Sequence, residues 1–332
     1  MKSLWLITFA AACASFQDPD IVVDLRVESI VAEPANQVVD ISGSSSEADI
    51  LAQLVPTTVC ALTSDPSFDG GLDWTMTMCN LATDDRCENG TNMGSDVSPM
   101  IFIGSGTIAD PDTTSPEPQL CATIQPNTDL VSVLLNYIQN DPLMGLGGVD
   151  YGIVLEVGDV GSDPANDQFA AKTLQVMPRI PSTVTQNHNP YITGMTAEVD
   201  GGGSAMLPLV RCADLPSTNT TPLIVSTDDV VRFTPLEGSD IHEVYVVPTI
   251  DGGSQTFTEA ISYQWNGGSG SFSSDSTGGP VDVFGNTPPL YTDWSAPEAG
   301  SISQMTDVPL FIIQRDDRLG EAWFESCIRV MP

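Results

Sequence analysis

The stretch LDWTMTM, residues 72–78, decides the fold class, because apolar and polar residues alternate along its whole length. Its leucine, tryptophan and two methionines would face one way and its three polar residues the other, which is the period of a half-buried β-strand. The stretch ISYQWN, residues 261–266, repeats this alternation around a second tryptophan. Each half of the chain therefore predicts a β-sheet with a tryptophan on a central strand.

Further strands are predicted by short runs of β-branched and aromatic residues between turn residues. These runs are 21–27, 100–103, 151–157, 173–176, 230–233, 243–247, 308–315 and 323–330. Residues 128–140 break the pattern, since their apolar residues recur at helical spacing between an Asn127 or Thr128 cap and Asp141-Pro142. They predict one helix packed across the end of a sandwich. Residues 50–62 are interpreted mostly as a strand, although residues 47–54 could form a short helix.

Length and composition favour two domains. The chain has 332 residues, too many for one ordinary sandwich, and 41% of them are hydrophobic, enough for real cores. Residues 178–190 hold three prolines and no hydrophobic period, which is typical of a linker. We therefore predict an all-β protein of two tandem Ig-like β-sandwich domains, residues 21–177 and 191–332, with one short helix in the first domain.

The first twelve residues predict export. A single positive charge, Lys2, precedes a short apolar run, and three alanines precede Cys13. This arrangement resembles the lipobox of bacterial lipoproteins, which implies that residues 1–12 are a signal peptide and that Cys13 is acylated, with palmitate as an acyl group. Ala14 after the cysteine implies the outer membrane of a bacterial cell envelope. Residues 13–20 would then be a polar tether. The alternative is a buried N-terminal helix with an incidental cysteine.

The cysteine count suits an oxidising compartment. Seven cysteines become six once Cys13 is set aside, and six allow fifteen pairings. Four fall in the first predicted domain and two in the second, so the pair Cys212–Cys327 is forced if bridges stay within domains. Cys79–Cys87 would close a short loop, which leaves Cys60–Cys121. Free thiols or a zinc site are the alternatives, but no C-x-x-C spacing occurs and the chain has two histidines.

The charge is strongly acidic, since 44 aspartates and glutamates against 10 lysines and arginines give a net charge of −34. Such a surface repels phosphate backbones, so we predict no nucleic-acid partner. Scattered acids usually make a surface soluble, whereas clustered ones could bind Ca²⁺. Two loops offer candidates without EF-hand spacing: Asp110, Asp112 and Glu117 in one, and Asp159, Asp163 and Asp167 in the other. No other cofactor is predicted.

No catalytic motif stands out in the sequence. The two histidines, His188 and His242, have no nucleophile or metal-ligand motif around them, and no G-x-S-x-G elbow or phosphate-binding loop occurs. With 44 acids a close carboxylate pair would arise by chance, so their number is no evidence for glycoside hydrolysis. Trp74 and Trp265 could stack on a sugar, but the alternation around each favours the core. We therefore predict no catalytic residues and no enzyme.

Several short motifs resemble the Ig/PKD-like β-sandwich domains of surface lipoproteins of the myxobacterial type. In the second half these are YQW at 263–265, GSF at 270–272, WSAP at 294–297 and RDDRLG at 315–320. NHNP at 187–190 and DPDIVVD at 18–24 are similar to sequences in the same group. The resemblance covers residues 1–30 and 187–330 well and the first domain loosely. It implies a sandwich architecture and no particular activity.

The sequence thus favours a non-enzymatic, lipid-anchored cell-envelope protein that acts as a binding, adhesion or structural module. It would contact the membrane through the N-terminal lipid and have an unidentified protein or glycan as partner. The alternative is a secreted carbohydrate-binding protein or glycoside hydrolase, which requires an aromatic-lined groove with paired carboxylates. A calcium-stabilised adhesin is a third hypothesis.

Overall fold

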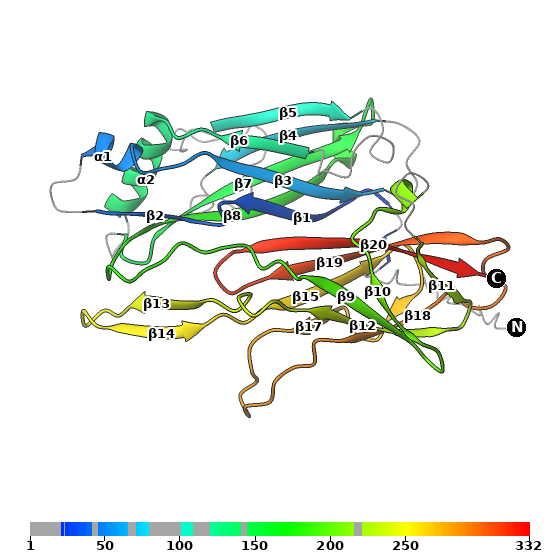
Figure 1. The fold of residues 1–332 in the computed structure, drawn as a ribbon. Helices are drawn as coiled ribbons and strands as arrows, with labels where there is room; N and C mark the ends of the chain where they lie inside the picture. The colour runs from blue at the N-terminus through cyan, green and yellow to red at the C-terminus, as the bar shows by residue number, and fades with distance from the viewer. Residues whose placement is uncertain are drawn as a thin grey trace, which may run out of the picture.

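The structure is a computed structural model, and it describes residues 21–22, 24–41, 46–65, 71–79, 101–108, 120–140, 145–215 and 221–332. It is built mostly of strands, which confirms the all-β sandwich class (Figure 1). Among the described residues no helix is long and apolar enough to cross a membrane.

The N-terminal half has two facing sheets, with strand orders β1-β3-β6 and β2-β8-β7-β4-β5. Neighbouring strands are antiparallel, except that β2 runs parallel to β8. The elements are β1 (Arg26–Glu33), β2 (Gln37–Val39), α1 (Glu47–Leu51), β3 (Thr57–Ser64), β4 (Leu72–Cys79), β5 (Ile101–Ile108), β6 (Leu120–Ile124), α2 (Thr128–Asn140), β7 (Val149–Asp159), the 3-10 helix η1 (Pro164–Asn166) and β8 (Gln168–Pro178).

The C-terminal half has two larger sheets, with orders β10-β9-β12-β18-β16 and β11-β20-β19-β15-β17, and a separate hairpin, β13-β14. The elements are β9 (Gly194–Val199), β10 (Ser204–Leu207), the 3-10 helix η2 (Cys212–Asp214), β11 (Leu223–Ser226), β12 (Val230–Leu236), β13 (Val244–Pro248), β14 (Ser254–Thr258), β15 (Ser262–Gly267), β16 (Ser271–Phe272), β17 (Ser276–Gly278), β18 (Thr292–Ser295), β19 (Thr306–Arg315) and β20 (Glu321–Met331).

Strand alternation builds a separate core in each half. The apolar face of β4, with Trp74 in its middle, packs in one cluster with β1, β3, β6, β7, β8 and α2. A second cluster joins β9, β12 and β18 to β15, β19 and β20 around Trp265 and Trp294. The Trp265 Nε1 donates to Thr277 Oγ1 at 2.9 Å, so its polar atom is satisfied inside the core. The boundaries 21–177 and 191–332 stay a prediction.

The sheet β1-β3-β6 stacks on the sheet that contains β19 and β20, so that the two halves form successive layers (Figure 1). Residues 28–32 of β1 and 310–314 of β19 are buried without a break. Because a strand covered on one face shows alternating burial, this pattern means that both faces are covered. Val22, Leu62 and Phe311 belong to the small apolar cluster at this junction.

Charged groups complete the junction. Lys172 Nζ, on β8, lies 2.8 Å from Glu321 Oε2, at the start of β20, and both side chains are buried. Ser29 Oγ donates to the other carboxylate oxygen of Glu321 at 2.8 Å, and Arg315 Nη2 donates to the same oxygen at 3.1 Å. A charge out of water needs such partners, so the four side chains act as a unit.

The segment before β1 also crosses to the C-terminal half. Ile21 forms a parallel bridge with Gly267 at the end of β15, and the Val22 amide donates to the Gly267 carbonyl at 3.0 Å. Beside this bridge, Asn266 Nδ2 donates to the buried Glu28 carboxylate at 2.8 Å. Burial raises the pKa of Glu28 above its ordinary value. The beginning of the chain is therefore attached to the half that ends it.

Residues 178–190, predicted as a linker, pack between the two halves. The Asn187 amide N–H donates to Asn36 Oδ1 at 2.8 Å, while Asn187 Nδ2 donates to Asp316 Oδ2 at 2.9 Å. Asn189 Nδ2 donates to the Ala32 carbonyl of β1, and Asn189 Oδ1 accepts from the Glu321 amide at the start of β20. Both asparagines are buried, as is Val184, so hydrogen bonds as well as apolar packing hold this segment.

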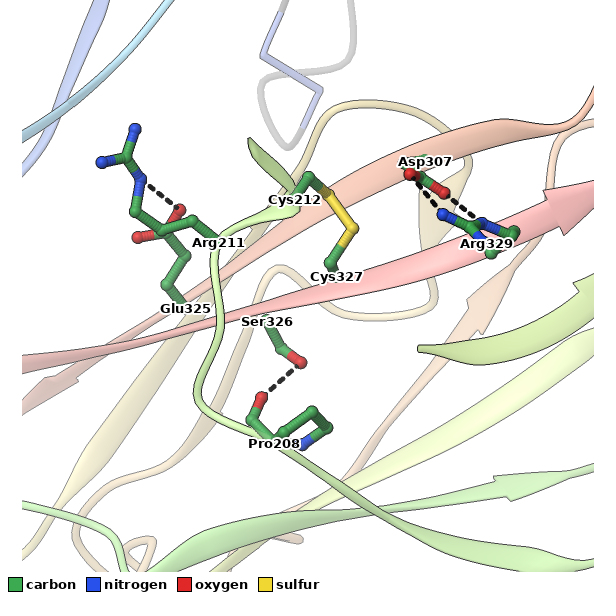
Figure 2. The surroundings of a disulfide bond; sticks show 8 residues. All are labelled: Pro208, Arg211, Cys212, Asp307, Glu325, Ser326, Cys327 and Arg329. Carbon is green, nitrogen blue, oxygen red and sulfur yellow. Dashed lines mark hydrogen bonds and ion pairs between the residues drawn. A yellow bond between two sulfur atoms is a disulfide. The ribbon is translucent and has the colours of Figure 1, made fainter. Parts of the chain in front are cut away.

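Within the described residues there are two disulfides, Cys60–Cys121 and Cys212–Cys327, and both pairings are those expected from the sequence. Cys60 and Cys121 lie opposite each other on β3 and β6, with Cα atoms 4.1 Å apart. Cys212 of η2 is bonded to Cys327 of β20, 115 residues away (Figure 2). Next to this bond, Ser326 Oγ donates to the Pro208 carbonyl, which ties the chain before η2 to β20 a second time (Figure 2).

The helix prediction for residues 128–140 is confirmed by α2, where Asn127 Oδ1 caps the start by accepting from Leu130 N at 2.8 Å. The structure adds a second helix, α1, in the region that the sequence left open. Ser46 and Asp49 form a reciprocal capping box there. The capping box therefore favours a helix at residues whose apolar pattern alone did not distinguish a helix from a strand.

Candidate binding surface

The hairpin β13-β14 extends away from the two sheets of the C-terminal half (Figure 1). Every residue of β14 is exposed, and Ile250 near the hairpin tip is 88% exposed. In the tip, Asp251 accepts from Thr249 Oγ1 and from Gly253 N, and Gly252 has a φ of +82°, which glycine adopts without strain. The turn itself therefore holds Ile250 out in water.

The loop after β17, residues 279–291, forms a second projection (Figure 1). Asp282 shapes it by accepting from the amides of Phe284 and Asn286 at 2.8 and 2.9 Å and from Asn286 Nδ2 at 2.8 Å. These bonds, the Asn286 side chain first, lower the pKa of Asp282 below its ordinary value. Val283 and Phe284 at the tip are 93% and 86% exposed. Again a built turn presents large apolar side chains to solvent.

We call residues 244–258 and 279–291 together the projecting surface. It contains two charged residues, Asp251 and Asp282, on a chain whose net charge is −34. Protein interfaces are depleted of charge at their centre and enriched in aromatic residues. The exposed apolar and aromatic residues of this surface are Val244, Val247, Ile250, Phe257, Val281, Val283, Phe284 and Tyr291. Such a surface can bind a partner by apolar contact.

An ionic cluster fastens the base of the hairpin to the body. Arg318, in the turn between β19 and β20, has its Nη1 3.3 Å from Glu243 Oε2 and 3.1 Å from Glu259 Oε1. Glu243 precedes β13 and Glu259 follows β14, so one guanidinium holds both ends of the hairpin. The same guanidinium lies 4.8 Å from the centre of the Tyr245 ring. Because the Arg318 side chain is only 9% exposed, salt screens these pairs little.

Both histidines of the chain join this cluster. His188 Nδ1 lies 2.5 Å from Glu243 Oε1. His242 Nε2 lies 3.1 Å from Glu237 Oε2, and its Nδ1 lies 2.9 Å from the Glu259 carbonyl. Burial lowers the pKa of His242, but these hydrogen bonds outweigh it and the pKa is raised above its ordinary value. The histidines looked unrelated in the sequence because the hairpin base brings them together only in the fold.

Glu259 is the most perturbed acid of the cluster. Burial and the negative charge of Asp316 raise its pKa to about 7, although the positive charge of Arg318 acts in the opposite sense. Its side chain therefore changes charge near neutral pH, at the point where the hairpin joins the body.

We expect the free energy of unfolding to fall by about 1–2 kcal/mol between pH 5 and pH 8 because of Glu259. In the folded state the pKa of Glu259 is about 7, whereas the ordinary pKa of glutamate is 4.5. Stability from a raised acid pKa is present at low pH and is lost as the pH rises through this window. His242, whose pKa is also raised, contributes in the same sense.

Urea unfolding at several pH values should show a smaller fall for Glu259→Gln than for the natural protein. The control is Glu298→Gln at an exposed position, which should keep the natural slope. Equal slopes for Glu259→Gln and the natural protein would contradict the prediction.

The other predicted site residues do not converge on one place. Trp74 and Trp265 are buried in the cores, as predicted, so neither can stack on a sugar. Within the part of the chain that the structure describes, no three His, Cys, Asp or Glu residues are placed to hold a metal, and this includes Asp159, Asp163 and Asp167. The predicted residues that lie outside the described part of the chain are Cys13, Cys87 of the Cys79–Cys87 pair, Asp110, Asp112 and Glu117.

Comparisons with known proteins assign no family. No protein-family model and no curated protein matches the sequence. The native conformation of alpha-2-macroglobulin from E. coli is 9% identical with a TM-score of 0.20, over 95% of this chain and 17% of that one. A second similar structure is SGBP-B of the mixed-linkage glucan utilization locus of Bacteroides ovatus, in complex with a mixed-linkage heptasaccharide. It is 10% identical with a TM-score of 0.18, over 93% of this chain and 47% of that one. The collagen adhesin of S. aureus is 9% identical with a TM-score of 0.15, over 92% and 93%.

This chain spans 17% of the macroglobulin and 47% of the glucan-binding protein, so it is much shorter than either. At TM-scores this low, these similarities carry no argument about function.

The projecting surface can be recognised in the sequence by large apolar residues that stand among turn formers, outside the predicted strands. Val283 and Phe284 interrupt a run of turn formers, GGPVDVFGNTPP at residues 278–289. Ile250 lies likewise in PTIDGG, residues 248–253. Large apolar residues surrounded by Gly, Pro, Asp and Asn are poorly placed for a core, because turns run over the surface.

Proposed function

We propose that this protein is a non-enzymatic binding module of the bacterial cell envelope and that the projecting surface is its contact site for a protein partner. The observation that carries this proposal is the exposure of Ile250, Val283 and Phe284 on two charge-poor projections of a strongly acidic chain. Dedicated turns hold these side chains in water, where they contribute nothing to the core. A partner that covers them would bury apolar area that the folded protein alone leaves in water, which favours binding.

The contacts that hold the base of the hairpin support the same proposal. Arg318 fixes both of its ends, and Tyr245 stacks on Phe257 across the hairpin, with ring centres 5.6 Å apart. A contact surface on rigid supports loses less conformational entropy on binding than a free loop does. The partner face that fits is uncharged or weakly basic, since an acidic face would be repelled by the rest of the chain.

The membrane attachment is part of this proposal. The lipobox-like sequence before Cys13 supports it. The intact mass of the protein from bacterial membranes should correspond to a chain that starts at Cys13 with two or three acyl groups. An unlipidated chain that retains Met1 would overturn the anchor and leave the contact site to be tested separately.

The contact site is tested with isolated cell envelopes of the producing bacterium as the probe. The full chain with Cys13→Ser, which cannot be acylated, is titrated and the fraction that sediments with the envelopes is measured. We expect Phe284→Ser and Ile250→Ser each to raise Kd about tenfold, the effect of removing a central interface side chain. Met206→Ser, at an exposed position of β10, is the matched control and should stay within about twofold. Unchanged binding of both projecting variants would overturn the proposal.

A further inference from the structure

We infer that the N-terminal half binds a single alkyl chain in the cavity between its helices and the end of the sheet β2-β8-β7. The cavity has a volume of about 320 Å³ and is lined from α1, α2 and these three strands. This volume falls in the range of small-molecule sites in proteins. The site lies outside the projecting surface, so the inference does not depend on the proposed function.

The chemistry of the walls selects a hydrocarbon. Thirteen residues line the cavity, and none of them has a polar side chain. A buried water needs two to four polar partners, so these walls hold water poorly. A polar ligand would lose its hydrogen bonds to solvent without replacement. Apolar cavities smaller than this one take up apolar small molecules, and an alkyl chain would restore the close packing that protein interiors otherwise show.

The size of the cavity suits an alkyl chain. Helix α2 lines it from Val131 to Ile138, a rise of about 10 Å along the helix axis. The facing wall crosses three neighbouring strands at Val39, Val176 and Val149, also about 10 Å at the usual spacing of strands. Both walls thus extend over the length of a short alkyl chain, and we call the cavity the slot.

The slot opens to solvent between two isoleucines. Ile41 and Ile180 belong to its lining but are 38% and 43% exposed, whereas Val131 and Leu134 at its floor are buried. A ligand could thus place its chain inside and keep a head group in water. Because the net charge of the protein is −34, a neutral head group is favoured over an anionic one.

The test is calorimetric titration of the full chain with two probes that share one alkyl chain, decyl maltoside below its micelle concentration and decanoate. We expect saturable binding of one decyl maltoside per protein and weaker binding of decanoate at low salt. Ile180→Asp places a charge at the mouth and should raise Kd about tenfold, which corresponds to about 1.4 kcal/mol. Val160→Asp, equally exposed in the same half, is the matched control and should leave Kd within about twofold.

Leu134→Trp fills the floor of the slot and should abolish binding while raising Tm. If this variant fails to fold, Ile180→Asp alone decides. No saturable binding of either probe would overturn the inference, and so would equal Kd values for Ile180→Asp and Val160→Asp. Tighter binding of decanoate than of decyl maltoside would keep the slot but overturn the preference for a neutral head group.

Discussion

Glu321→Ala is expected to lower the free energy of unfolding by about 3–5 kcal/mol, because it leaves the Lys172 ammonium buried without its partner. The same change removes the acceptor of Ser29 and one partner of Arg315. A buried charge without a partner costs far more than an exposed one, so this position should stand out among the acids. The measurement is urea unfolding followed by both fluorescence and far-UV circular dichroism.

Two further variants test whether the loss of stability comes from the buried pair or from the removal of any acidic charge. Asp40→Ala breaks the exposed pair with Arg179 and should cost less than about 1 kcal/mol. Lys172→Met with Glu321→Leu removes both charges and should recover most of the stability, since matched apolar residues often replace a buried pair at no cost. A similar cost for Glu321→Ala and Asp40→Ala would show that the junction does not depend on this carboxylate.

Cys212→Ala with Cys327→Ala is expected to lower the free energy of unfolding by about 2–5 kcal/mol. The bond closes a loop of 115 residues, so its loss frees a large part of the unfolded chain. It also leaves a gap beside Val210 and Leu215, which pack on the buried Cys327. The midpoint of urea unfolding under non-reducing conditions measures this loss.

Cys60→Ala with Cys121→Ala is the matched comparison. Its loop of 61 residues is shorter, so loop closure alone predicts a loss smaller by about 0.6 kcal/mol. A Cys212→Ala, Cys327→Ala protein with the midpoint of the natural protein would contradict the prediction. So would an unchanged midpoint of the natural protein after full reduction.

Local pattern was enough to predict the central strands β4 and β15 and helix α2, but not every strand. The first strand was predicted at residues 21–27 and lies at Arg26–Glu33, and β6, β9, β11 and β14 were not predicted. The alternation at residues 72–78 and 261–266 depends only on which face of a strand meets the core. The caps of α2 lie next to it in the chain. The outcome for residues 178–190 is different, because Asn187 and Asn189 are polar and show no period. Their burial depends on partners from two halves that lie far away in sequence.

The ionic junction could not be predicted for the same reason. Lys172 and Glu321 are separated by 149 residues, and nothing near either one indicates a buried partner. Sequence spacing predicts contacts between near neighbours, whereas this pair depends on how the sheets stack. The exposure of Val283 and Phe284 could have been predicted, because these residues stand among turn formers.

The bridge from Ile21 to Gly267 gives a mechanical load two routes into the molecule. A pull on the chain ahead of residue 21 reaches β15 through the Val22 amide and the Gly267 carbonyl. From β15 it passes to β19 by direct strand pairing and so to the turn that holds Arg318. The same pull reaches β1 along the covalent backbone, so both halves would share a tension applied ahead of residue 21.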